Sequence, residues 1–240
     1  MNILVTGVSK GLGLNISKTL LKKGWKVYGI SRTTSLALEA LLAEYPARFY
    51  WLAYDLSDTK NIKNAIFKDW IGSQTPLHGF VNNAAMAYDD LITNLNQTEL
   101  ENMYAINVFT PMQVSKYVIR QFLLHKNKGS IVHLSSISVH TGYKGLAMYA
   151  STKGAIEAFS KNTAREWGEL GVRSNCLVAG FMETEMSASL TEEQKTRIYQ
   201  RTCLKQEVDK NSVAATIAFL LSEEAGSITG QNIHVDGGTI

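Results

Sequence analysis

Cysteine and proline are scarce in this chain of 240 residues, which contains only two cysteines and three prolines. Two cysteines cannot build a disulfide framework, so we interpret Cys176 and Cys203 as reduced thiols in a cytoplasmic protein. Long uncharged apolar stretches are also lacking, which argues against a membrane-spanning segment. A strand pattern that begins at Asn2 leaves no room for a targeting peptide. We therefore expect a cytoplasmic protein that does not enter a membrane.

An excess of charge of one sign is lacking as well. The formal net charge is +3, and the lysines and arginines are spread along the chain. Binding to nucleic acid or to an anionic lipid surface would need a basic cluster, so we expect neither partner. Separately, we expect no bound metal ion. Repeats, low-complexity tracts and linkers are not found. Because the chain is long enough for a sizeable core, residues 1–240 are predicted to form one domain.

The first motif combines a strand, a glycine-rich turn and a helix. The apolar run 3–5 predicts a buried parallel strand, the turn covers 6–13, and a helical pattern follows it up to Gly24. Glycine lets the backbone approach a pyrophosphate, and a helix N-terminus offers free N–H groups, so this order favours a dinucleotide site over an ordinary tight turn. The candidate cofactor-binding residues in the turn are Gly7, Ser9, Lys10, Gly11, Leu12 and Gly13.

The end of the second predicted strand, 26–30, indicates which dinucleotide is preferred. A fold that prefers NAD usually places an acidic residue here to hold the ribose hydroxyls. This chain has Ser31 and Arg32 instead, with Lys10 in the preceding turn. Two cations and no carboxylate suit a 2′-phosphate, which favours NADP(H) over NAD(H). The alternative is that Arg32 is a solvated loop charge.

Further candidate cofactor-binding residues follow the next two predicted strands. Asp55 and Leu56 come after the strand 49–53, where an adenine ring would lie, although Asp55 could equally cap the following turn. Asn83 follows the strand 79–81. Strands and helices alternate with lengths typical of a Rossmann-type α/β fold. We therefore predict a doubly wound parallel sheet of about seven strands, with helices on both faces.

A long helical pattern from about residue 99 to residue 125 contains Pro111 near its middle. Proline has no N–H group, so the helical hydrogen bond to the carbonyl of Asn107 cannot form. We expect this carbonyl to bind either a water molecule or the ammonium group of Lys153. The alternative is a proline kink without chemical consequence.

Ser136, Tyr149 and Lys153 are candidate catalytic residues. Ser136 ends an apolar run, 130–136, that predicts a buried fifth strand. Tyr149 and Lys153 lie four residues apart on a long predicted helix, so their side chains share one face. Tyrosine normally titrates near ~10. A neighbouring ammonium charge should lower this pKa, which would let Tyr149 exchange a proton with a carbonyl oxygen.

The segment 181–207 contains no strand pattern and interleaves methionine, leucine and tyrosine with charged residues. Because it follows the carboxyl end of the sixth predicted strand, 173–178, we expect a helical lid over a substrate pocket. Four cations near this lid could bind an anionic substrate group, unless they are solvated surface charges: Lys195, Arg197, Arg201 and Lys205.

Eight motifs occur in one order along the chain. They are Thr6-Gly7-x-x-x-Gly11-x-Gly13, the Asp55–Leu56 pair, Asn82-Asn83-Ala84, Asn107, Ser136, Tyr149-x-x-x-Lys153, Gly180-x-x-x-Thr184, and the C-terminal segments 228–231 and 235–238. With these motifs the chain resembles the classical short-chain dehydrogenase/reductases over essentially its whole length. It is most similar to their 3-oxoacyl-(acyl-carrier-protein) reductase-like branch, which shares the sequence around residues 183–186.

This resemblance implies a role for each candidate catalytic residue. Tyr149 would donate a proton to the carbonyl oxygen, or accept it during oxidation, and Ser136 would hydrogen-bond that oxygen. Lys153 would lower the pKa of Tyr149 and hold the nicotinamide ribose. Asn107 would position a water molecule that links Lys153 to solvent. The dinucleotide would supply the hydride.

Two positions depart from the family pattern. The family usually has proline where this chain has Ala179, and glycine where this chain has Ala85. The first change loosens a backbone restraint beside Gly180 and Thr184, which would hold the nicotinamide end of the cofactor. The second change adds only a methyl group near the adenosine. Neither change removes a reacting group.

The expected activity is NADPH-dependent reduction of a ketone, or the reverse oxidation of the alcohol. A 3-oxoacyl thioester, carried by a partner protein or free, is the first expected substrate, and a sugar-like, steroid or secondary-metabolite carbonyl is the alternative. A non-catalytic dinucleotide sensor is a further hypothesis, but such a protein would be expected to lack Tyr149 or Lys153. The resemblance also implies a homotetramer, or a dimer.

Overall fold

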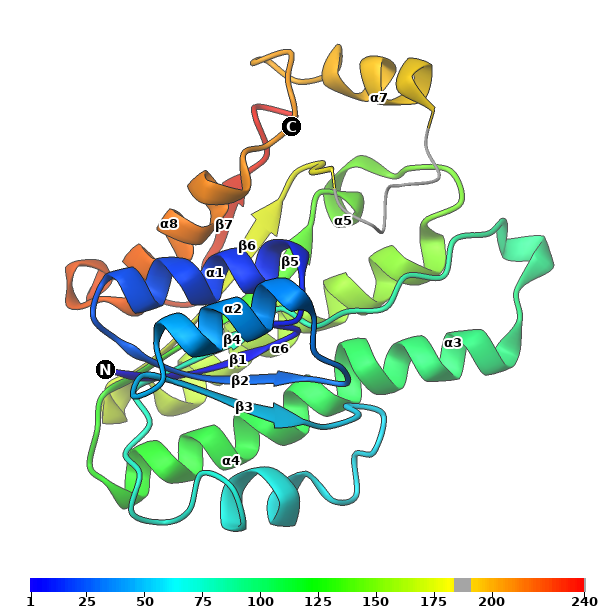
Figure 1. Cartoon of the computed structure of the whole chain (residues 1–240). Helices are drawn as coiled ribbons and strands as arrows, with labels where there is room; N and C mark the ends of the chain where they lie inside the picture. The colour runs from blue at the N-terminus through cyan, green and yellow to red at the C-terminus, as the bar shows by residue number, and fades with distance from the viewer. Residues whose placement is uncertain (184–190, 240) are drawn as a thin grey trace.

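A seven-stranded parallel sheet forms the centre of the structure, a computed structural model that describes residues 1–183 and 191–239 (Figure 1). The strand order is β3-β2-β1-β4-β5-β6-β7, and each neighbouring pair is parallel. The predicted doubly wound α/β fold is therefore confirmed. The strands are β1 Asn2–Thr6, β2 Lys26–Ser31, β3 Phe49–Ala53, β4 Gly79–Asn82, β5 Gly129–Ser136, β6 Val172–Ala179 and β7 Asn232–Val235.

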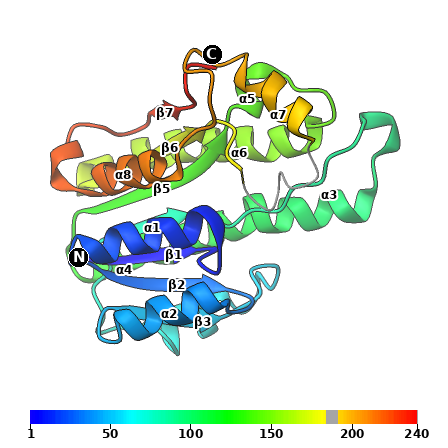
Figure 2. The same ribbon diagram turned by 45° about the horizontal axis from the view of Figure 1, so that its top comes forward.

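Helices cover both faces of this sheet, as Figures 1 and 2 show. One face carries α1, α2 and α8, and the other carries α4 and α6. In the described part of the chain, no helix is long and apolar enough to cross a membrane. The helices are α1 Gly11–Lys22, α2 Leu36–Glu44, α3 Gln97–Tyr104, α4 Thr110–Leu124, α5 Ser138–Thr141, α6 Ala147–Trp167, α7 Glu192–Tyr199 and α8 Lys210–Leu221.

The alternation of side chains along the strands divides the core into two clusters, because successive side chains point to opposite faces of a sheet. In β1, Ile3 and Val5 pack in the cluster under α1 and α8, whereas Leu4 packs in the cluster on the α4 face. All three side chains are completely buried. Short runs of consecutive apolar residues are therefore explained by strands that are covered on both sides.

π-Helical segments occur at two places in the described chain. One is a π-helix at Lys63–Lys68, and the other is Ala105–Phe109, which joins α3 and α4 in the long helix predicted around Asn107. Pro111 lies at the start of α4. Its missing N–H group is accommodated by the wider π-helical segment that precedes it, so the chain continues as a helix without a break.

The glycine turn after β1 is packed tightly against itself. Gly7 has a φ of +76° and donates its N–H to the Ile30 carbonyl at 2.7 Å. A Cβ added at Gly13 would lie 2.0 Å from the carbonyl oxygen of Gly7. The first turn of α1 can therefore approach β1 this closely only when residue 13 lacks a side chain.

We predict that Gly13→Ala lowers the free energy of unfolding by about 1–3 kcal/mol, because the methyl group must displace the Gly7 backbone. Urea denaturation measures this change. Gly154→Ala is the matched control, since its Cβ would meet Val139 at 3.6 Å, an ordinary contact distance. This control should be neutral or up to about 1 kcal/mol more stable, because alanine favours a helix. Equal losses in the two variants would contradict the steric explanation.

Candidate active site

The turn between β1 and α1 leaves space for phosphate groups beside its backbone. Gly11 has a φ of +56°, and a Cβ added there would meet nothing within 4 Å. α1 begins at Gly11 and has no acidic residue in its first turn, so its N–H groups and positive dipole end favour an anion. Ser35 Oγ donates to the Ser9 carbonyl at 2.5 Å and fixes the turn. These residues fit the pyrophosphate of a dinucleotide.

The predicted adenosine-binding residues lie at the ends of β2 and β3. Lys10 and Arg32 are both exposed. Asp55 Oδ1 accepts a hydrogen bond from Ser57 N at 2.9 Å, so Asp55 caps the following turn, as its alternative interpretation predicted. Hydrogen bonds from Ser57, and then the charge of Arg32, lower the pKa of Asp55. Leu56 is buried in the core, which leaves its backbone as the part that could contact an adenine.

Asn83 joins the glycine turn to the segment that follows β4. Its Nδ2 donates to the carbonyl oxygens of Thr6 at 2.9 Å and Gly7 at 3.2 Å. Thr6 Oγ1 in turn accepts from the backbone N–H groups of Asn83 and Ala84, both at 3.1 Å. The strand order reverses direction between β1 and β4, which is where such sheets bind ligands. Asn83 therefore fixes the glycine turn to the segment after β4, at the position where a ligand is expected.

Ser136, Tyr149 and Lys153 meet at the carboxyl end of β5. Lys153 Nζ donates to the Leu134 carbonyl at 2.9 Å and lies 5.6 Å from the centre of the Tyr149 ring. A hydrogen bond between the side chains of Ser136 and Tyr149 contributes to the pKa of Tyr149. Ser136 Oγ accepts from Ser138 N at 3.2 Å and Ser138 Oγ at 3.0 Å. The structure thus brings the three predicted catalytic side chains together.

The pKa of Tyr149 differs from the prediction. Burial, followed by the negative charge of Asp89, raises it to about 12, and the hydrogen bond with Ser136 opposes this rise. The predicted lowering by Lys153 is therefore wrong for this structure. Burial also lowers the pKa of Lys153 to about 8, and its ammonium group is directed to Leu134. Tyr149 is a neutral phenol at neutral pH and can act as a proton donor.

Asn107 holds two segments of the site together through its side chain. Its Oδ1 accepts from Met86 N at 2.8 Å, and its Nδ2 donates to the Met86 carbonyl at 2.8 Å and to Thr152 Oγ1 at 3.0 Å. The segment after β4 is thereby fixed to α6 beside Lys153. The ammonium group contacts Leu134 rather than the Asn107 carbonyl, so a water molecule on that carbonyl stays a prediction.

A cavity of about 670 Å³ opens beside these groups. Leu12 and Asn83 line it on the side of the glycine turn, and Gly180 lines it at the end of β6. Gly180 N donates to the Val235 carbonyl at 3.0 Å, and a Cβ added at Gly180 would lie 2.6 Å from the backbone of Asp236. Thr184, the other residue predicted at this end, lies outside the described residues.

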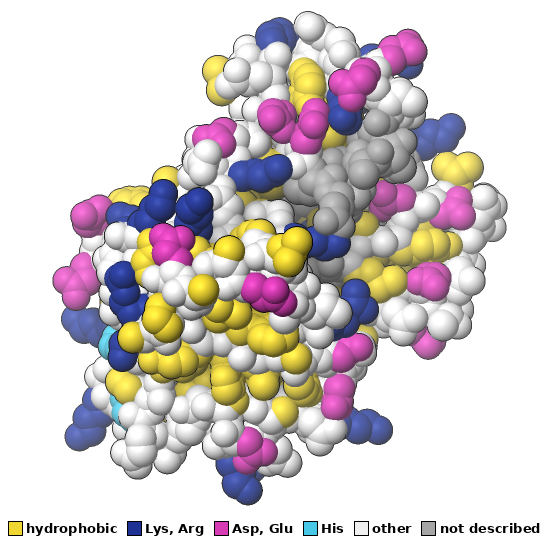
Figure 3. Space-filling model, viewed as in Figure 1, with side chains coloured by type: hydrophobic (Ala, Val, Ile, Leu, Met, Phe, Trp, Pro, Cys, Tyr) yellow, Lys and Arg dark blue, Asp and Glu magenta, His cyan; other side chains and the backbone are white. Residues whose placement is uncertain are grey.

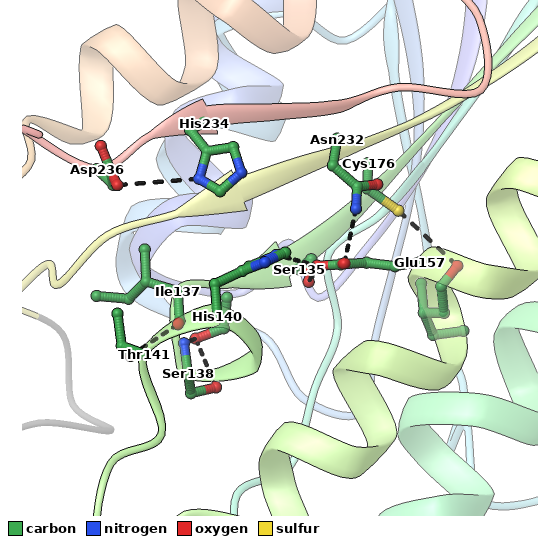
Figure 4. Close-up of polar contacts among 12 residues, drawn as sticks. Ser135, Ile137, Ser138, His140, Thr141, Glu157, Cys176, Asn232, His234 and Asp236 are labelled. Carbon is green, nitrogen blue, oxygen red and sulfur yellow. Dashed lines mark hydrogen bonds and ion pairs between the residues drawn. The ribbon is translucent and has the colours of Figure 1, made fainter. Parts of the chain in front are cut away.

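A buried carboxylate behind Ser136 was not recognised from the sequence. Glu157 accepts hydrogen bonds from Ser135 Oγ at 2.5 Å and Asn232 Nδ2 at 2.7 Å, and its Oε1 lies 3.1 Å from His140 Nε2 (Figure 4). These partners belong to β5, β7 and α5, so Glu157 ties three elements to α6. One signal was available: Glu157 lies four residues after Lys153, on the same helix face.

Comparison with known proteins identifies the family. A family model described as enoyl-(acyl carrier protein) reductase matches residues 7–239. The chain is 32% identical over 235 residues to the 3-oxoacyl-(acyl-carrier-protein) reductase FabG of Vibrio cholerae serotype O1, covering 98% of this chain and 95% of that protein. The FabG of Escherichia coli (strain K12) is 31% identical over 236 residues, with the same coverage. The chain belongs to the short-chain dehydrogenase/reductase family.

A solved short-chain dehydrogenase/reductase has the same fold. The gluconate 5-dehydrogenase from Burkholderia cenocepacia J2315, in complex with NADP and tartrate, superposes with a TM-score of 0.92 at 21% identity, covering 99% of this chain and 94% of that one. The resemblance expected from the motifs is confirmed. As a member of this family, the chain is an NAD(P)-dependent oxidoreductase.

Stability at alkaline pH should depend on Lys153. The folded state lowers its pKa from 10.5 to about 8, so the unfolded chain binds more protons between these values. Below the folded pKa, the folded state therefore bears the full free-energy cost of burying the ammonium group. This cost decreases as the pH rises from the folded pKa to the unfolded pKa. The free energy of unfolding of wild type, minus that of Lys153→Met, should rise by about 3 kcal/mol across this window. Urea denaturation at several pH values measures the difference, and a constant difference would contradict a buried cation.

Proposed function

We propose that this protein is an NADPH-dependent reductase of a ketone, with Tyr149 as the proton donor. The observation that carries the proposal is the convergence of Tyr149, Ser136 and Lys153 on one cavity. When bound, the dinucleotide supplies the hydride, and the protein supplies orientation and electrostatics. The reverse reaction would use the same groups to oxidise the alcohol.

Ser136 is arranged to hydrogen-bond the carbonyl oxygen of a substrate. Its Oγ accepts hydrogen bonds from the N–H and the hydroxyl of Ser138. The hydroxyl proton of Ser136 is therefore available for a different acceptor, either Tyr149 or a substrate oxygen. A donor fixed in this way stabilises the negative charge that develops on the oxygen while the hydride arrives.

Tyr149 then transfers its proton to that oxygen. Its raised pKa keeps the phenol protonated before the reaction, and the hydrogen bond with Ser136, which opposes that rise, favours the phenolate that forms. We assign Lys153 to the nicotinamide ribose, and Asn107 to the water molecule through which the proton is replaced. Gly180 and Thr184 would hold the nicotinamide end of the cofactor.

A 3-oxoacyl thioester is the first proposed substrate class. The wall of the cavity is mostly apolar, which suits an acyl chain, and includes Leu91, Ile137, Leu146, Phe181, Met182 and Ile198. The relatives that share about a third of the sequence are named as 3-oxoacyl reductases. A sugar-like, steroid or secondary-metabolite carbonyl is the alternative, and the segment 181–207 is proposed as the lid that selects between them.

We further propose a homotetramer or a dimer. The proposal is supported by large apolar side chains that are exposed on the α3–α4 unit, where Phe109 is 53% exposed and Leu124 is 60% exposed. A second copy would cover this surface. Size-exclusion chromatography with light scattering measures the assembly, and a monomer at micromolar concentration would contradict the proposal.

Tyr149→Phe should lower kcat about 100-fold or more, because the variant keeps the ring but loses the transferable proton. A panel of ketones and 3-oxoacyl thioesters, monitored by NADPH absorbance, provides the substrate. Tyr143→Phe is the matched control, since Tyr143 lines the same cavity and should keep most of the rate. A Tyr149→Phe enzyme with the full rate would show that another group donates the proton.

Arg32→Ala should raise the Kd of NADPH about 10-fold or more and change the Kd of NADH about 2-fold at most, because only NADPH carries the 2′-phosphate. Titration of each cofactor by fluorescence measures both constants. Lys26→Ala removes an exposed cation at the other end of β2 and should affect neither. Equal weakening of the two cofactors by Arg32→Ala would contradict a 2′-phosphate site.

A further inference from the structure

The charged groups on the cavity wall come from different segments. Asp89 and Asp90 belong to the segment that follows β4, Lys144 precedes α6, and Arg201 follows α7. Figure 1 shows α7 at the top of the molecule and the segment between β4 and α3 at the right. Asp89 lies close enough to Tyr149 for its charge to act on the phenol. Asp89 therefore lies on the side of the reacting tyrosine.

Three of the four cations near the lid are already engaged by neighbours. Lys195 Nζ lies 2.7 Å from Glu192 and 3.5 Å from Glu183, and Arg197 pairs with Glu193 at 2.6 Å. Figure 3 shows basic and acidic side chains interspersed at the top of the molecule, where Figure 1 places α7. The third cation, Lys205, donates from its Nζ to the Gln200 carbonyl at 2.6 Å.

Arg201 differs from these three cations. It lines the cavity, and within residues 1–183 and 191–239 no carboxylate pairs with it. Its backbone is fixed, because Arg201 N donates to the Ile198 carbonyl at 3.1 Å and the next residue, Thr202, is buried. Cys203 N then donates to the Gly238 carbonyl at 3.0 Å. The backbone that carries Arg201 is thus fixed beside an apolar cavity, while the residue itself is exposed.

We propose that Arg201 binds an anionic group of the substrate, a carboxylate or a phosphate, and so selects and orients the ketone; this inference rests on the proposed function. A guanidinium group forms two parallel hydrogen bonds with either anion. Asp89 repels an anion near Tyr149. The anionic group is therefore directed towards Arg201, and the carbonyl is left beside Tyr149 and Ser136.

Binding without turnover provides the first test. Acetoacetate is added to the protein without dinucleotide, and the melting temperature is measured for wild type, Arg201→Gln, Arg201→Lys and the control Arg197→Gln. A ligand that binds the folded state raises the melting temperature. We expect a rise for wild type and Arg197→Gln, a smaller rise for Arg201→Lys and none for Arg201→Gln. No rise in wild type, either with acetoacetate or with acetoacetyl-CoA in its place, or an undiminished rise in Arg201→Gln, would overturn the proposal.

Turnover with NADPH provides the second test and separates the two anions. The substrates are acetoacetate, acetoacetyl-CoA, which carries phosphates, and the acetoacetyl thioester of N-acetylcysteamine, which carries no charge. Arg201→Gln should lower kcat/KM about 10- to 100-fold for the carboxylate, the phosphate-bearing substrate or both, and leave the neutral thioester unchanged. Equal losses of kcat/KM on all three substrates would overturn the proposal. So would a Lys144→Gln variant that loses more kcat/KM on the charged substrates than Arg201→Gln does.

The two tests also separate this inference from the proposed function. If no ketone is reduced by the wild-type protein, the proposed reductase activity fails, and the melting-temperature series still decides whether Arg201 binds the anion. If ketones are reduced but Arg201→Gln does not discriminate between charged and neutral substrates, the reductase proposal stands and the role of Arg201 is refuted.

Discussion

The buried hydrogen bond from Lys153 Nζ to the Leu134 carbonyl is the constraint on which the active site depends. It joins α6 to β5 at a separation of 2.9 Å, and thereby places Tyr149, one helical turn before Lys153, beside Ser136, two residues after Leu134. An ammonium group that is removed from water must keep a partner, or lose its proton. The same hydrogen bond therefore aligns α6 with β5 and stabilises the charged form of Lys153.

Most of the polar groups around this bond position the reacting groups rather than react. Asn83 and Asn107 use their amide groups to fix the segment after β4 to the glycine turn and to α6. Glu157 performs the corresponding task behind Ser136, where it holds α5 and β7 to α6. Side chains that are locked by such contacts can hold a reaction geometry without further reorganisation, which is the main contribution of a protein to hydride transfer.

The sequence predicted the elements with strong local signals. The strand, turn and helix at 2–22 were expected within about three residues of their observed bounds, and a long helix that carries Tyr149 was expected, because apolar runs and glycine positions determine these elements locally. The π-helical segment around Asn107 and the short α5 were not expected, since both depend on packing against distant elements. The pKa of Tyr149 was predicted in the wrong direction for a similar reason: spacing indicates that Lys153 is near, but not that its ammonium group is directed to a backbone carbonyl.

The most direct measurement is a crystal structure of the protein with NADP⁺ and the alcohol product of a ketone that it reduces. The account predicts that the alcohol oxygen lies within hydrogen-bond distance, about 2.6–3.2 Å, of both the Tyr149 and the Ser136 hydroxyl groups, with its carbon facing the nicotinamide. An alcohol oxygen that contacts neither hydroxyl group, or a nicotinamide that binds outside this cavity, would contradict the account.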